Sequence, residues 1–413
     1  MKRILMVGAG SCQLNAIKKI KDMGHYVIAA DYNDWTEGKS MADAHVKADA
    51  FDQNEIYSAA LAYNIDGILT VGTDQPVYTV NVVAEKLKRA HFLDAETALW
   101  VTNKKAMKHR FTQFKIPTVP YAVVRKSFSA MSMVGIKPPY VIKPIDSQGQ
   151  RGIFKVDTID DIRQKFDEVL SYSREDEILV ESFYESEEIT VSGWVDSGKP
   201  HILTVTDRLT FPPEEKIGVC FAHQYPSKFH RVMDDKINQL VSDICCAFDI
   251  RKGPFYFQFL IGERGILVNE IACRIGGAYE DTTIPYVTSF DILKANIEGV
   301  IDETHQVNLN LTLNSSLRDQ KHFSTQLFFY TPGQIAFQTP IQTIKKHPFI
   351  LDAGYNFREG DEIGVIENAS QRAGYMIVTA ASTSELEKHI ALAFDTLVVR
   401  NNQGESMVRI PKG

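Results

Sequence analysis

The segment 255–277, FYFQFLIGERGILVNEIACRIGG, constrains the fold of this chain more than any other stretch. Two apolar runs, 255–261 and 266–271, flank the polar connection Glu263-Arg264-Gly265. This pattern predicts a β-hairpin closed by a three-residue turn, whose glycine adopts the left-handed conformation that such a turn requires. The remainder of the chain can be interpreted around this hairpin.

The two faces of the predicted hairpin differ, because successive side chains of a strand point to opposite sides. The register set by the turn places Gln258 directly opposite Glu270. The first face is expected to carry Tyr256, Gln258, Leu260, Ile266, Val268, Glu270 and Ala272. The second face is expected to be apolar core with one polar member, and it comprises Phe255, Phe257, Phe259, Leu267, Asn269 and Ile271.

An amide and a carboxylate that face each other on a sheet need a partner. A buried carboxylate is costly unless it is paired, hydrogen-bonded or bound to a metal, and paired oxygen ligands suit Mg²⁺ shared with substrate phosphates. Arg274 and the flexible pair Gly276-Gly277 follow the second strand, where an arginine suits a developing negative charge. The alternative is an ordinary hairpin in which Glu270 pairs with a lysine of the sheet.

Composition excludes several other classes of protein. The chain of 413 residues has a net charge of −7, which argues against a nucleic-acid partner. Its five cysteines form no CxxC pair, a pattern that fits neither a disulfide framework nor a zinc site. The N-terminus enters a strand without the pattern of a signal peptide, and no apolar run approaches the roughly 18 residues of a membrane span. We therefore expect a cytoplasmic protein without a membrane partner.

The N-terminal region predicts a small parallel α/β domain. A strand at 4–7, the turn Gly8-Ala9-Gly10-Ser11 and a helix are followed by a second strand at 26–30, which is the beginning of a dinucleotide-binding fold. The glycine fingerprint fails at its third position, where Gln13 stands instead of a small residue. A dehydrogenase is therefore kept only as a third alternative.

A second set of signals indicates phosphate binding. The strand 140–143 ends in Lys143, and the loop that follows contains Gly149, Arg151 and Gly152. A lysine before a flexible loop rich in N–H donors can hold phosphate oxygens, although the Walker sequence is absent. A solvated hairpin loop is the alternative interpretation of the same residues.

The next strands predict contacts to a nucleoside. Exposed backbone between Glu181 and Phe183, which includes Ser182, could pair with a purine edge, and Glu188 could accept hydrogen bonds from ribose hydroxyls. An ordinary polar turn is the alternative for the acidic residues between these strands. The segment 209–229 has little periodicity and is interpreted as a substrate loop.

The order of these signals resembles the ATP-grasp superfamily over roughly residues 1–300. The resemblance implies an α/β and α+β multidomain protein with a Rossmann-like parallel α/β domain at 1–101. An ATP-grasp domain would follow at 102–305, with a lid at about 115–178 and a nucleotide and metal sheet at about 179–300. A small α+β domain would occupy 306–413.

The resemblance also implies roles for individual residues. Lys104 and Lys143 would hold the phosphates of ATP from two sides, and the loop containing Gly149 and Gly152 would be a mobile cover. Glu181, Ser182 and Phe183 would form the hinge that meets adenine through its backbone. Glu188 would be the carboxylate that binds the ribose, and Leu260 would lie beneath the purine.

The metal motif of the family becomes Gln258 followed by Glu270-Ile271-Ala272-Cys273-Arg274 in this chain. The glutamine is similar to that of the carbamoyl-phosphate synthase ATP-binding domains. The run Arg274-Ile275-Gly276-Gly277 is similar to L-amino acid ligases and to relatives such as phosphoribosylglycinamide synthetase. Gln258 and Glu270 would bind Mg²⁺ or Mn²⁺, and Ala272 in place of asparagine leaves a second metal one ligand short.

The implied activity joins a small-molecule carboxylate to an amine, with amino acids among the candidates. Catalysis would involve Arg274, an acyl phosphate, and release of ADP and phosphate. The second function class is a nucleotide-binding homologue without turnover, for which Ala272 is the sequence argument. The resemblance is also compatible with a homodimer.

Overall fold

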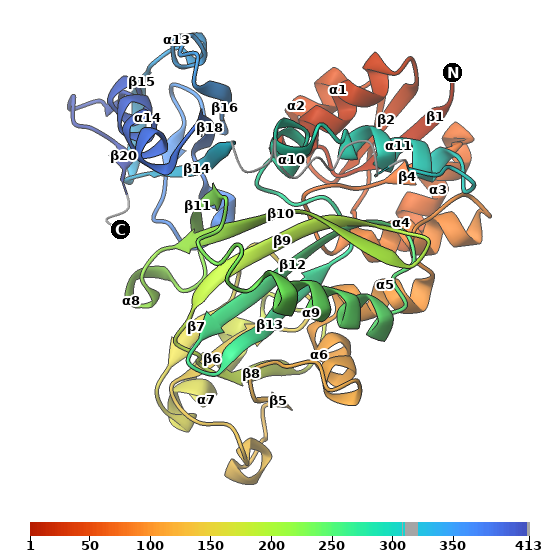
Figure 1. The fold of residues 1–413 in the computed structure, drawn as a ribbon, viewed down its shortest axis with the longest axis vertical. Coiled ribbons are helices and arrows are strands. Elements are labelled where there is room, and N and C mark those ends of the chain that lie inside the picture. The colour runs from red at the N-terminus through yellow and green to blue at the C-terminus, as the bar shows by residue number, and fades with distance from the viewer. Residues whose placement is uncertain (308, 310–320, 411–413) are drawn as a thin grey trace.

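The computed structural model describes residues 1–307, 309 and 321–410, and its parts are arranged around one large sheet (Figure 1). The N-terminal part contains a parallel sheet in the order β3-β2-β1-β4, as the sequence predicts. Its strands are β1 (Arg3–Val7), β2 (Tyr26–Asp31), β3 (Ala44–Lys47) and β4 (Gly67–Leu69). Its helices are α1 (Leu14–Asp22), α2 (Glu37–Met41), α3 (Gln53–Tyr63) and α4 (Pro76–Lys86).

Nine of the described strands form the central sheet, in the order β13-β12-β9-β10-β11-β14-β18-β16 with β20 also paired to β14. The strands that precede residue 306 are β9 (Glu187–Asp196), β10 (Lys199–Thr210), β11 (Cys220–Tyr225), β12 (Gly253–Gly262) and β13 (Gly265–Ala272). The helix α9 (Asp234–Ala247) packs its apolar stripe against the phenylalanines of β12. On the other side, α10 (Glu280–Thr288) and α11 (Ile292–Ile301) share a core with α1, which joins the N-terminal part to the sheet.

A smaller antiparallel sheet, in the order β5-β8-β6-β7, faces the hairpin of the central sheet. Its strands are β5 (Tyr121–Val124), β6 (Tyr140–Pro144), β7 (Phe154–Val156) and β8 (Ile178–Ser182), with α7 (Ile159–Leu170) packed on them. Two helices, α5 (Ala95–Thr102) and α6 (Lys104–Gln113), connect this sheet to the N-terminal part. We refer to the sheet and α7 as the lid.

The C-terminal part continues the central sheet, because β14 pairs with β11. It contains β14 (His322–Tyr330), β15 (Gly333–Gln338), β16 (Ile350–Tyr355), β17 (Glu362–Ile363), β18 (Gly374–Ala380), β19 (Val399–Asn401) and β20 (Val408–Arg409). Two helices, α13 (Ile341–Lys345) and α14 (Thr383–Thr396), complete an α+β arrangement. The domain borders predicted from the sequence stay predictions.

Within the described residues, no helix combines the length and the apolar character needed to cross a bilayer.

The hairpin β12–β13 has the predicted pairing of Gln258 with Glu270, but it reaches this pairing in a different way. The predicted three-residue turn is wrong, because Gly262 pairs with Gly265 and leaves a two-residue connection. A bulge at Asn269 restores the register by adding one residue to β13.

The bulge also changes which side chains share a face. Val268 pairs with Phe259 and is fully buried, so its predicted place beside Glu270 is wrong. Asn269, which was predicted on the core face, instead lies within reach of Lys143. The face of the hairpin that carries Glu270 is therefore more polar than the alternation of polar and apolar residues in the sequence indicates.

The segment 209–229 is not the irregular loop that its sequence pattern indicates. β10 extends to Thr210, a short helix α8 (Pro213–Lys216) follows, and β11 then enters the central sheet between β10 and β14. β11 lies between two strands, so local alternation is a weak guide to its structure.

Phe257 tests how far the site depends on the packing behind it. Its ring is fully buried between Phe255 and Phe259, against α9 and directly beside Gln258. Phe257→Ala should lower the free energy of unfolding by about 3–5 kcal/mol because it leaves a cavity in this core. Urea titration measures the effect, with Phe337→Ala as a control because that ring is 45% exposed. Equal losses of the free energy of unfolding in the two variants would contradict the assignment of Phe257 to this core.

Candidate active site

A cavity of about 310 Å³ lies between the lid and the central sheet, and we call it the lid cavity. Its wall includes most of the residues that the sequence links to a nucleotide. From the lid come Lys143, Glu181, Ser182, Phe183 and Tyr184, and from the sheet come Glu188, Leu260, Asn269 and Glu270. The segment 210–218 forms another side, with both prolines, Ile217 and Gly218. Segments far apart in the sequence therefore meet at one site.

A second cavity of about 410 Å³ adjoins the first, and we call it the junction cavity. Its wall takes residues from the N-terminal part, the lid, the central sheet and the C-terminal part. The polar members of this wall include Asp74, Lys104, Gln148, Arg151, Arg208, His223, Gln258, Glu270, Arg274 and Arg372. Glu270, Gln150 and Ile153 line both cavities. The two spaces therefore meet at Glu270 and at the loop 145–153 between β6 and β7, which we call the lid loop.

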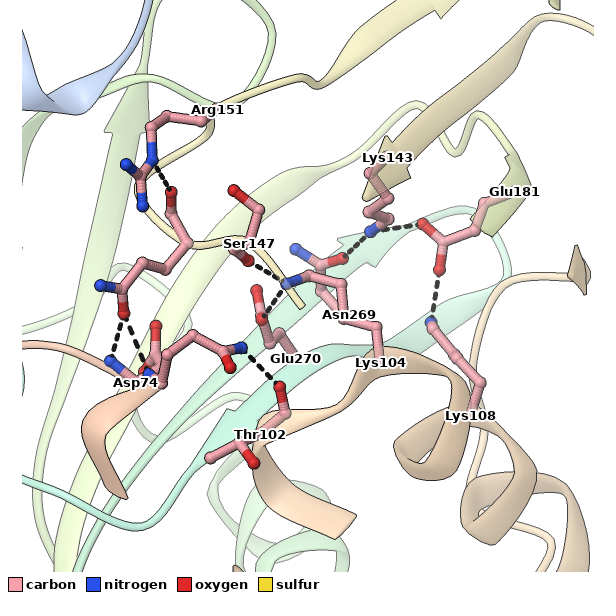
Figure 2. A network of polar contacts seen from close by, with 12 residues as sticks. Asp74, Thr102, Lys104, Lys108, Lys143, Ser147, Arg151, Glu181, Asn269 and Glu270 are labelled. Atoms are coloured by element: carbon pink, nitrogen blue, oxygen red, sulfur yellow. Dashed lines mark hydrogen bonds and ion pairs between the residues drawn. The ribbon is translucent and has the colours of Figure 1, made fainter. Parts of the chain in front are cut away.

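Glu181 holds two lysines at the edge of the lid cavity (Figure 2). Its carboxylate oxygens lie 2.5 Å from Nζ of Lys143 and 2.7 Å from Nζ of Lys108, and all three side chains are almost fully buried. Burial alone would raise the pKa of Glu181, but the two lysines outweigh it and lower this pKa to about 2. Glu181 thus neutralises charge that would otherwise be costly to bury.

The expectation of free backbone at the hinge needs correction. The N–H of Ser182 donates to the carbonyl of Pro120 at 2.9 Å, and that of Phe183 donates to the carbonyl of Pro139 at 2.8 Å.

The sequence analysis did not identify Lys108 as a site residue, because its partner Glu181 belongs to a distant strand. One signal was present in the sequence: Lys108 lies four residues after Lys104, and residues four apart share a helix face.

Lys104, at the start of α6, contacts Glu270. Its Nζ lies 3.1 Å from a carboxylate oxygen of Glu270 and donates to the carbonyl of Ser147 at 2.6 Å (Figure 2). Burial disfavours the charged form of Glu270, yet Lys104, Lys143 and Arg274 together hold its pKa below the ordinary value. Glu270 is therefore an ionised carboxylate surrounded by cations. Its lysine partner, Lys104, comes from the start of α6 and not from the sheet, as the ordinary-hairpin alternative required.

Gln258 provides the test of whether a metal fits here. Its Oε1 atom is buried without a hydrogen-bond partner, and the residue pairs directly with Glu270 across the hairpin. Such an orphaned oxygen is costly unless something absent from the chain binds it. One amide oxygen and one carboxylate fit Mg²⁺, which takes its remaining ligands from water and phosphates. Ala272 is buried opposite Tyr256 and offers no ligand.

Arg274 is fixed by contacts to two parts of the chain. Its Nε donates to Asp74 at 2.7 Å, and one terminal nitrogen donates to the carbonyl of Ile275 at 3.1 Å. The guanidinium also lies over the ring of Tyr256, 4.9 Å from its centre. Burial opposes the charge of Arg274, but Asp74 outweighs it and raises the pKa. Asp74 follows a buried strand, which is a common place for functional residues in parallel sheets. The sequence around Asp74 nevertheless did not indicate that it would pair with Arg274.

Glu188 lies in the wall of the lid cavity, but its carboxylate is not free. It forms an ion pair with Arg208 at 2.5 Å, and Arg208 donates further to the carbonyl of Gly218 at 2.8 Å. A ribose could therefore meet this carboxylate only beside an existing arginine. Leu260 lies in the same wall, as the resemblance implies.

The lid loop is held by hydrogen bonds to the N-terminal part and to the C-terminal part. The Gln148 side chain accepts from the backbone N–H groups of Asp74 at 2.7 Å and Gln75 at 3.1 Å, while Gly149 accepts from the N–H of Ala369 at 3.1 Å. Gly152 has φ +72°, and a Cβ there would lie 2.7 Å from the Tyr172 ring, so glycine is required. Movement of this loop stays a prediction.

The glycine turn of the N-terminal sheet is occupied by the protein itself. Gln13 accepts from the N–H of Gly10 at 2.9 Å and donates to the carbonyl of Val71 at 2.6 Å, while Asp31 accepts from the N–H of Ala9 at 3.0 Å. These are the donors that would hold a pyrophosphate in a dinucleotide fold. The dehydrogenase alternative loses its structural basis here.

Comparison with known protein families identifies the class of protein to which this fold and site belong. Residues 136–282 match the family model of the ATP-grasp domain, and residues 326–402 match that of the L-amino acid ligase C-terminal domain 2. The chain thus carries an ATP-grasp domain behind an N-terminal parallel α/β domain. The resemblance and the fold class predicted from the sequence are confirmed.

Particular relatives point in the same direction. An L-arginine-specific L-amino acid ligase of Bacillus subtilis is 23% identical over 325 residues, which cover 76% of this chain and 75% of the relative. The crystal structure of an L-amino acid ligase from Bacillus licheniformis superimposes with a TM-score of 0.82 at 14% identity, covering 97% and 99% of the two chains. A phosphoribosylglycinamide synthetase from Anaerococcus prevotii gives 0.77 at 18% identity, covering 97% and 100%. The structural likeness concerns the fold.

The Glu181 ion pairs predict a pH dependence of stability. The pKa of Glu181 falls from an ordinary 4.5 to about 2 on folding, so its contribution is complete above 4.5 and is lost as the pH falls toward 2. Glu181→Gln should cost about 3–5 kcal/mol at pH 7, because it leaves two buried lysines without a carboxylate. Urea titrations of both proteins between pH 7 and pH 3 should show this difference narrow below pH 4.5. A difference in the free energy of unfolding between the two proteins that does not change with pH would contradict a lowered pKa for Glu181.

Proposed function

We propose that this chain is an ATP-dependent ligase that joins a carboxylate to an amine, with amino acids as the substrate class, and that it releases ADP and phosphate. The observation that carries the proposal is the meeting of the two cavities at Glu270. A nucleotide in the lid cavity would direct its phosphates to this point, where Lys104 and Lys143 converge. A carboxylate in the junction cavity would approach the same point from the opposite side.

The walls suit these two ligands differently. The lid cavity offers apolar side chains for a base, including Leu260, Ile217 and Phe221. The charged residues of its wall are Lys143, Glu181, Glu188 and Glu270. Lys143 would contact the phosphates directly and could exchange part of its interaction with Glu181 for them. Gln258 and Glu270 would hold Mg²⁺, which supplies neutralisation of phosphate charge when it is bound.

The reaction would begin when a carboxylate oxygen of the first substrate attacks the γ-phosphorus. The bond from that phosphorus to the β–γ bridging oxygen breaks, so ADP leaves and an acyl phosphate forms. The neutral amine then attacks the acyl carbon, and phosphate leaves as the C–N bond forms and the amine loses a proton. Arg274, held by Asp74, would face the charge on the transferred phosphoryl group and on the acyl phosphate.

The test of this function is release of ADP in response to substrates. Purified protein with MgATP is incubated with each common L-amino acid, singly and in pairs, while ADP, AMP and phosphate are quantified and products are identified by mass spectrometry. ADP and phosphate should appear in equal amounts with a condensed product. Binding of MgATP without amino-acid-dependent ADP release would instead support the nucleotide-binding homologue. Formation of AMP would contradict the chemistry proposed.

Arg274→Ala should separate catalysis from nucleotide binding. Loss of one group that stabilises a developing anion lowers kcat by roughly 10² to 10³, and the KM for ATP should change much less. Steady-state kinetics with the substrates found in the library measures both constants. Arg251→Ala is the matched control, since that arginine is 77% exposed and contacts Asp249. Undiminished kcat in Arg274→Ala would remove this residue from the mechanism.

A further inference from the structure

Lys108 is a buried cation of α6 that belongs to the wall of neither cavity. Its Nζ lies 2.7 Å from Oε1 of Glu181 and donates to the hydroxyl of Thr118 at 2.6 Å. Burial of an ammonium group is costly, and an apolar side chain of similar length could fill the same space without that cost. Lys143 already neutralises Glu181, so the charge of Lys108 calls for a role beyond packing.

The hydroxyl of Thr118 continues this chain of contacts to the hairpin. It must accept from Lys108, because an ammonium group has only donors, and its single proton goes to the carbonyl of Val268 at 2.7 Å. The N–H of Val268 donates to the carbonyl of Pro117 at 2.7 Å. Residues 117–118 thus pair with β13 along the edge of the central sheet. The position of Val268 is tied to Lys108 through one hydroxyl.

The contacts close into a ring that begins and ends at neighbouring residues of β13. On the lid side, Glu181 lies 2.5 Å from Nζ of Lys143, and this nitrogen lies 3.5 Å from Oδ1 of Asn269 (Figure 2). Asn269 is the extra residue of the bulge, and Glu270 follows it directly. In order, the members of the ring are Val268, Thr118, Lys108, Glu181, Lys143 and Asn269. The ring therefore connects the lid lysine to the strand that carries Glu270.

The ring holds two lysines and one carboxylate, so it carries one positive charge in excess. Lys143 lines the lid cavity and Lys108 does not, so Lys143 is the cation that a phosphate can reach. When Lys143 gives its interaction to a phosphate, Lys108 still neutralises Glu181. Without Lys108, the same exchange would leave a buried carboxylate unpaired, which is costly.

We propose that Lys108 and Thr118 are positioning residues, which hold Lys143 of the lid and Glu270 of the hairpin at a fixed separation before MgATP binds. The inference rests on the nucleotide and metal positions of the proposed function, and it assigns roles to two residues outside both cavity walls. Phosphates at Lys143 and Mg²⁺ at Glu270 then fit each other without rearrangement of the lid. Mg²⁺ and the nucleotide should therefore strengthen each other's binding, and the hydroxyl of Thr118 should be part of that coupling.

The test measures this coupling without turnover. Calorimetry on the full chain gives the affinity for ADP with and without Mg²⁺, and the ratio of the two affinities is the gain that Mg²⁺ provides. Thr118→Val keeps the shape of the side chain and removes the hydroxyl. It should lower the gain about 10- to 100-fold while the affinity for ADP alone changes little. Thr118→Ser keeps the hydroxyl and should retain the gain of the wild type.

A second variant and a matched control accompany this measurement. Lys108→Met removes the ammonium group and leaves Glu181 paired with Lys143. It should lose the gain as Thr118→Val does, and it should also weaken ADP alone, because Glu181 then retains Lys143. Thr339→Val is the control, since that hydroxyl also contacts backbone carbonyls, at 3.0 Å and 3.2 Å, but in the C-terminal part. It should behave as wild type.

Several results would overturn the inference. These are an undiminished gain in Thr118→Val, equal weakening of ADP with and without Mg²⁺ in that variant, loss of the gain in Thr118→Ser, and a wild type without any gain. An undiminished gain in Lys108→Met overturns it equally, which keeps the test decisive if Thr118→Val does not fold. Absence of ADP release with every amino acid defeats the proposed ligase activity instead, and calorimetry still decides the roles of Lys108 and Thr118.

Discussion

Two carboxylates, the buried Glu181 and the partly buried Glu270, hold the cations of this site together. Glu181 neutralises Lys108 and Lys143 at the lid, and Glu270 lies against Lys104 at the start of α6. Without these partners, the positive side chains would repel one another and would lose their hydration on burial. With these carboxylates as partners, several cations can lie close together at the site before a more highly charged ligand binds.

The same arrangement explains why one residue can serve both cavities. Glu270 extends from the second strand of a hairpin whose other face is the phenylalanine core, so its backbone is fixed by packing. Its neighbour Gln258 has an oxygen that no protein group satisfies. A rigid sheet thus presents one charged and one uncharged oxygen toward the place where the two cavities meet, which is what positioning of a metal-bound phosphate requires.

The junction cavity depends on contacts between parts that are distant in the sequence. Asp74 of the N-terminal part orients Arg274, Gln148 of the lid accepts from the backbone at Asp74, and Arg372 of the C-terminal part contacts Gly277. Each part supplies groups that another part lacks. A substrate held there would lie beside groups from all of these parts.

The sequence by itself determined the features that depend on local chemistry. The register of the predicted turn paired Gln258 with Glu270, a pairing that the structure has although it reaches it through a different turn and a bulge. A strand that ends in Lys143 before a glycine loop indicated where phosphates would bind. Tertiary structure decided the rest. The bulge at Asn269 depends on packing against the core, and Lys108 gains its role only from Glu181 on a distant strand. Side-chain periodicity records which face of a strand is buried, whereas long-range ion pairs and cavity walls arise only when separate segments pack together.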